Sequence, residues 1–124
     1  MFQIASVMKQ IEQIYCNDFG MAFYWTAQNT VMLDRIQLVF KETGFYFSID
    51  ELKAFVKLID DSCRRNTCNH CEMKHQCSKF LLKTPISQID LAVSMKELDG
   101  IKDLVAGTLF KVDLQEYIYG VGMN

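Results

Sequence analysis

The chain has 124 residues, of which 50% are hydrophobic and 12% aromatic, and its formal net charge at pH 7 is −2. This composition excludes an intrinsically disordered chain, and the length favours a single domain over residues 1–124. The sequence pI of about 5.6 argues against a broad nucleic-acid-binding surface.

Features that would direct the chain to a membrane or out of the cell are missing from the sequence. No apolar run approaches the roughly 18 residues of a membrane span, and the first residues lack the basic region of a signal peptide. We therefore expect a cytoplasmic protein with reduced thiols and no membrane partner. The apolar content also suggests a face covered by a protein partner, for which a homodimer is one candidate.

The first segment has the apolar spacing of an amphipathic helix, so the sequence predicts an N-terminal helix. Its apolar residues recur at intervals of three and four residues: Ile4, Val7, Met8, Ile11, Ile14 and Tyr15. The helix should end within residues 16–20, where Gly20 is a stop signal. Cys16 stands apart from the other cysteines and is expected to be a small buried residue.

The next region changes to the period of strands. Strands are expected at residues 21–26, 31–33, 36–40 and 45–47, joined by turns at 27–30 and 42–44. Ser48 and Glu51 then form a capping box that begins a helix. One apolar stripe of this helix leads to Cys63 in its last turn.

The same order of elements recurs after the cysteines. Strands are expected at 79–84 and 89–93, and Ser94 with Glu97 forms a second capping box. That helix should extend to about Leu109, and a separate short helix with apolar residues from Leu114 should follow.

The two capping boxes sit in similar surroundings, FYFSIDEL at 45–52 and LAVSMKEL at 91–98. They predict two related strand–strand–helix units separated by a Cys-rich insertion at 63–79. The expected fold class is α+β, with one antiparallel sheet packed by helices.

The insertion, CRRNTCNHCEMKHQC at 63–77, carries the most unusual chemistry of the sequence. It holds four of the five cysteines and both histidines. A pair of cysteines two residues apart is a common chelating unit of structural zinc, and such sites usually add a second pair of ligands. The candidate zinc ligands are Cys63, Cys68, Cys71 and Cys77, with His70 and His75 as alternates.

Other chemistries fit the same segment and stay open. The C-x4-C-x2-C spacing begins like that of plant-type ferredoxins, which would suggest an iron–sulfur cluster. The C-x2-C-x5-C tail resembles the cluster loop of endonuclease III-type DNA glycosylases, although that family separates its first two cysteines by more than the four residues found here. The resemblance covers this segment alone and implies no glycosylase activity. A redox dithiol at Cys68 and Cys71, or no metal at all, is also compatible with the sequence.

Four basic residues accompany the cysteines: Arg64, Arg65, Lys74 and Lys79. They could offset the charge of zinc-bound thiolates, or they could contact nucleic acid. No phosphate-binding glycine loop, nucleophile elbow or zinc-protease motif occurs.

The sequence therefore favours a non-catalytic interaction or regulatory module with a structural zinc. An iron–sulfur or thiol-based redox sensor or electron-transfer protein is the second hypothesis, and a nucleic-acid-binding module is the third.

Overall fold

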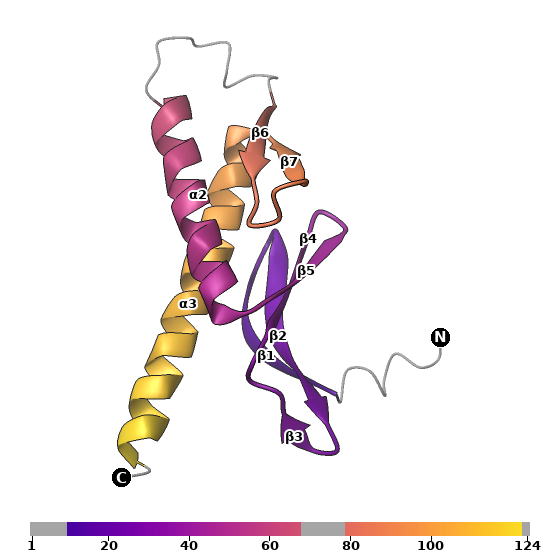
Figure 1. Cartoon of the computed structure of the whole chain (residues 1–124), viewed down its shortest axis with the longest axis vertical. Helices are drawn as coiled ribbons and strands as arrows, with labels where there is room; N and C mark the ends of the chain where they lie inside the picture. Colours follow the sequence, from indigo (N-terminus) through magenta and orange to yellow (C-terminus); the bar gives the residue numbers. More distant parts are fainter. Residues whose placement is uncertain (1–9, 68–78, 123–124) are drawn as a thin grey trace.

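In the computed structural model, residues 10–67 and 79–122 are described, and they form antiparallel strands and two helices (Figure 1). The α+β class expected from the sequence is confirmed. The elements in chain order are β1 (Ile11–Asn17), β2 (Gly20–Ala27), β3 (Thr30–Val31), β4 (Ile36–Phe40), β5 (Thr43–Phe47), α2 (Ile49–Thr67), β6 (Phe80–Lys83), β7 (Asp90–Val93) and α3 (Met95–Gly122). Within these ranges, neither helix has the length and apolar character that crossing a membrane requires.

The main sheet is antiparallel and has five strands in the order β1-β2-β4-β5, with β3 paired to the end of β2. Two tight turns shape it. Gln28 and Asn29 have φ values of 53° and 66°, and Lys41 and Glu42 have 51° and 63°. Positive φ at both central residues is what two-residue hairpin turns of type I′ require. The sequence placed this turn at 42–44 because of Gly44. In the structure its central residues are Lys41 and Glu42, and Gly44 belongs to β5.

The core lies between this sheet and the two helices. Residues that alternate along the strands, such as Leu38 in β4 and Phe45 in β5, are buried against Leu52 and Phe55 of α2. Figure 1 shows α2 and α3 crossing on one side of the strands, with the β6–β7 hairpin beside their upper halves. Because each strand alternates, one face of the sheet supplies the core and the other does not.

Both capping boxes are formed as the sequence predicts. The backbone N–H of Ser48 donates to Oε1 of Glu51 at 2.9 Å, and the N–H of Glu51 donates to the Ser48 hydroxyl at 3.2 Å. The corresponding distances for Ser94 and Glu97 are 2.9 and 3.1 Å. Each of these helices also follows a hairpin of two antiparallel strands, β4–β5 before α2 and β6–β7 before α3.

The two strand–strand–helix units do not share one sheet, contrary to expectation. The β6–β7 hairpin forms a separate two-stranded sheet. It packs on the helices instead, because the buried side chains of Leu82 and Val93 join the common core.

The expectation of an N-terminal helix is wrong from Ile11 onward, because Ile11–Asn17 is strand β1. The remaining part of that prediction, with Ile4, Val7 and Met8, lies outside the described residues. A register shift between Gln13 and Tyr15 explains the error. Such a β-bulge breaks the two-residue period of a strand, so the apolar spacing imitates a helix. Cys16 is exposed on this edge strand and not buried as expected.

Two helix boundaries also differ from expectation. Helix α2 continues to Thr67, so residues 63–67 of the predicted insertion are helical. Helix α3 is continuous over Met95–Gly122, so no second short helix begins near Asp113. No proline interrupts α3. The sequence suggested a new helix because Leu114, Tyr117 and Ile118 lie on the side of α3 opposite to the buried core residues.

Candidate metal centre

Cys63 is the one candidate ligand whose surroundings the structure describes. It lies on the stripe of α2 that contains the buried Ile59, and it packs half-buried against the core. Burial raises the pKa of the Cys63 thiol; nearby Asp99 and Asp60 act in the same direction and Lys102 opposes them. These surroundings favour the neutral thiol, whereas the form that binds a metal is the thiolate.

The other candidate ligands, Cys68, Cys71, Cys77, His70 and His75, lie outside the described residues. Within residues 10–67 and 79–122, no three His, Cys, Asp or Glu side chains are grouped so as to hold a metal ion. The metal centre therefore stays a prediction from the spacing of the sequence. The structure adds the surroundings of Cys63 and of the described residues on either side of the segment, the end of α2 and Lys79.

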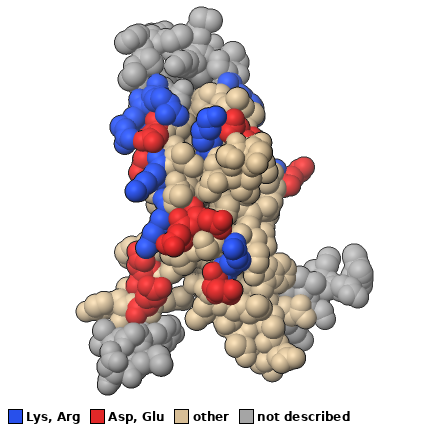
Figure 2. Space-filling view, viewed as in Figure 1, with Lys and Arg blue, Asp and Glu red and all other residues tan. Residues whose placement is uncertain are grey.

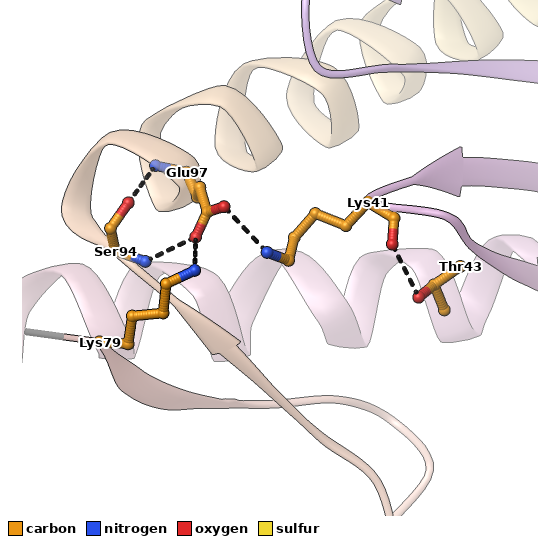
Figure 3. A network of polar contacts seen from close by, with 5 residues as sticks. All are labelled: Lys41, Thr43, Lys79, Ser94 and Glu97. Carbon is orange, nitrogen blue, oxygen red and sulfur yellow. Dashed lines mark hydrogen bonds and ion pairs between the residues drawn. The ribbon is translucent and has the colours of Figure 1, made fainter.

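Lys79, the first described residue after the cysteine segment, belongs to a polar network around Glu97 (Figure 3). The Lys79 ammonium, directly before β6, donates to Oε1 of Glu97 at 3.1 Å. The Lys41 ammonium, from the β4–β5 turn, donates to Oε2 at 2.8 Å. Oε1 also accepts the backbone N–H of Ser94. One carboxylate therefore connects the β4–β5 turn, the residue before β6 and the cap of α3.

The charges in this network shift the protonation of its members. The hydrogen bond from Lys41 is the main reason that the pKa of Glu97 falls to about 2, and the backbone N–H of Ser94 and the Lys79 ammonium lower it further. Partial burial acts against this shift. The pKa of Lys41 is raised in turn, chiefly by its hydrogen bond to Glu97. The carboxylate is thus ionised at any physiological pH.

Basic side chains gather at the end of the molecule where α2 finishes, as Figure 2 shows. Arg64 and Arg65 are exposed in the last turns of α2. Arg64 forms an ion pair with Asp61 one turn earlier, and Lys79 contacts Glu97. Arg64 and Lys79, which the sequence suggested as partners of thiolates or of nucleic acid, are therefore already paired with carboxylates. Lys74 lies outside the described residues.

A second group of hydrogen bonds, which the sequence did not reveal, connects β1 to α3. The Tyr15 hydroxyl donates to Oδ2 of Asp103 at 2.9 Å, and Nδ2 of Asn17 donates to the same oxygen at 2.9 Å and to the carbonyl of Gly100 at 3.0 Å. The pKa of Tyr15 is raised, mainly because its hydroxyl donates to Asp103.

Two glycines of α3 make this close approach of β1 possible. A Cβ atom at Gly100 would overlap the ring of Phe19, and one at Gly107 would overlap the ring of Tyr15. Because glycine is unfavourable inside a helix, two glycines seven residues apart, on one side of the predicted helix, were the available signal in the sequence for a close contact. The participation of Lys41 had no local signal, because its partner is 56 residues away.

Searches of protein-family models, of curated proteins and of solved structures find no match to this chain.

Proposed function

We propose that this chain is a non-catalytic interaction module in which cysteines of the segment 63–77 bind a structural zinc ion. The clustering of cysteines in this segment supports the metal, because a polar segment with little apolar content gains order from coordination that it cannot gain from burial. A reducing compartment such as the cytoplasm would keep the thiols available for a metal.

Two described carboxylates have shifted pKa values, and neither shift suits a general acid. A general acid that works at neutral pH needs a raised carboxyl pKa. The pKa of Glu97 falls to about 2, and the pKa of Glu51 is lowered chiefly by the backbone N–H of Ser48. Both carboxylates serve as helix caps and ion-pair partners. The observation that carries the proposal is the clustering of four cysteines and two histidines in residues 63–77.

A hollow of about 520 Å³ lies beside the β1–β2 turn. Cys16, Asp18 and Lys41 are among the residues that line it. The amine of Lys41 has a raised pKa because it contacts Glu97, so it is held as a charged ammonium. A lysine that acts as a base or nucleophile needs a lowered pKa.

The proposal leaves three ligand sets for the zinc. Cys68, Cys71 and Cys77 belong to all three, and the fourth ligand is Cys63, His70 or His75. Cys63 is half-buried and packs against the core at the point where the segment begins. The variant Cys63→Ser distinguishes Cys63 from a histidine as the fourth ligand.

The test is elemental analysis of the purified chain, combined with an absorption spectrum recorded without oxygen. We expect about one zinc per chain and no visible absorbance. Cys68→Ser and Cys71→Ser should lose the metal, whereas Cys16→Ser, at an exposed cysteine of β1, is the matched control and should retain it. Cys63→Ser should also retain it if a histidine completes the site.

Each alternative gives its own result. A brown protein with visible absorbance and bound iron would establish the iron–sulfur hypothesis instead. A metal-free protein whose Cys68 and Cys71 oxidise reversibly to a disulfide would establish the dithiol hypothesis. Zinc that is bound equally by the wild type and by the Cys68 and Cys71 variants would place the metal elsewhere and end the proposal.

A further inference from the structure

The C-terminal half of α3 carries an apolar stripe on the side of the helix opposite to the core. Thr108 and Val112 of α3 face the core and are buried. The stripe consists of Phe110, Leu114, Tyr117 and Ile118, with side chains that are 64, 42, 71 and 51% exposed. These positions follow i, i+4, i+7 and i+8, which places them on one helix face.

This stripe begins where the contact between β1 and α3 ends. The ring of Tyr15 lies against Gly107, and from Phe110 onward the side chains on this side of α3 are exposed. Helix α3 extends below α2 in Figure 1, so α2 does not shield the stripe. Four neighbouring apolar residues on a helix face mark a surface that another helix can cover.

The charges beside the stripe indicate what covers it. At 100° per residue, Lys111 falls on one flank of the stripe and Asp113 on the other, and both are exposed. When two copies of such a helix lie parallel about a two-fold axis, the positive flank of each faces the negative flank of the other. Residues 1–9 of the chain contain one lysine and no acidic residue, so they offer Lys111 no partner.

We propose that a second copy of this chain covers the stripe, with the two α3 helices side by side and parallel, and with Lys111 of each copy beside Asp113 of the other. The apolar side chains expose on the order of 400–500 Å² per copy, which is less than the roughly 800 Å² per partner of a standard stable interface. The dimer should therefore be weak and depend on concentration. The proposal rests on α3 alone and is independent of the zinc proposal.

The experiment is sedimentation equilibrium of the full chain over a range of concentrations. We expect monomer at roughly 1 µM and mostly dimer, with a doubled mass, at roughly 100 µM. Phe110→Glu should abolish the dimer. Leu81→Glu, at a similarly exposed leucine of β6, is the matched control and should leave the dimer intact.

Charge reversal then tests the arrangement. K111D and D113K should each weaken the dimer at least about tenfold in dissociation constant, because like charges then face each other twice. An equimolar mixture of these two variants should restore a dimer, since every flank pair is again opposite in sign. A monomer at all concentrations, a dimer that survives Phe110→Glu, or a mixture that fails to associate would each overturn the proposal. Circular dichroism confirms that every variant is folded.

Discussion

The ammonium of Lys41 lies 2.8 Å from Oε2 of Glu97, and this ion pair joins the β4–β5 turn to the first turn of α3. The other carboxylate oxygen accepts the N–H of Ser94 and contacts Lys79. Glu97, which caps α3, therefore also contacts the β4–β5 hairpin. A local capping motif thus takes part in a tertiary contact.

Replacing Glu97 with glutamine should destabilise the fold. Glu97→Gln keeps the size of the side chain but removes its charge, so the ion pairs with Lys41 and Lys79 are lost and the cap is weakened. We expect the free energy of unfolding to fall by about 1–2 kcal/mol, measured by urea denaturation.

The matched control for this variant is Glu51→Gln, because Glu51 occupies the same place in the first capping box. Among residues 10–67 and 79–122, Glu51 pairs with the cation of Arg35, and its side chain is 45% exposed, compared with 24% for Glu97. Water screens the more exposed pair more strongly, so Glu51→Gln should cost less stability. An equal loss in the two variants would show that Lys41 and Lys79 contribute nothing beyond the cap.

Glu97 should also make stability depend on pH in the acid range. Its pKa is about 2 in the folded chain, against 4.5 for an unperturbed glutamate. Because the folded state holds the proton less tightly than the unfolded state, the stabilisation is complete above pH 4.5 and is lost as the pH falls toward 2. Urea midpoints measured across this range should therefore differ between wild type and Glu97→Gln at pH 6 and converge near pH 2. A constant difference between the two proteins would contradict this origin of the shift.

The sequence predicts those elements whose signals are local. The capping boxes at Ser48 and Ser94 and the alternation in residues 36–40 were sufficient, because a cap and a strand face depend on residues within a few positions of one another. The bulge in β1 was not predictable in this way, because it exists only through pairing with β2.

The misjudged end of α3 has a different physical cause. Phe110, Leu114, Tyr117 and Ile118 lie on the side of the helix opposite to Val112, and a second apolar face looks in the sequence like the start of a new helix. Of the candidate site, the spacing of the cysteines could be read directly. The half-buried position of Cys63 could not, because it depends on the packing of α2 against the core.

Gly107→Ala should destabilise the chain although alanine is the better helix former. Alanine gains about 1 kcal/mol of helix propensity over glycine. However, its Cβ would overlap the ring of Tyr15, so the ring would have to move and the hydrogen bond from Tyr15 to Asp103 would be strained. We expect a net loss of at least about 1 kcal/mol in the free energy of unfolding, measured by urea denaturation.

A double-mutant cycle separates these two effects of Gly107→Ala. In a Tyr15→Ala background the ring is absent, so the same glycine substitution should become stabilising by up to about 1 kcal/mol. If Gly107→Ala is destabilising by the same amount in both backgrounds, the contact with Tyr15 is not the reason that glycine is needed there.

Removing zinc should loosen the cysteine segment without unfolding the domain. The described core includes Phe40, Phe55 and Leu104, which are buried between the sheet and the helices among other apolar side chains. Chelation should therefore leave the far-ultraviolet circular dichroism unchanged. Trypsin should cleave after Lys74 at least about tenfold faster in chelated than in zinc-loaded protein, because cleavage requires local opening of the segment.

Cys71→Ser should be cleaved quickly with or without zinc, and Cys16→Ser should behave as the wild type does. Loss of the helical signal on chelation would show instead that the metal is needed for the whole fold, and equal cleavage rates would show that zinc does not order the segment.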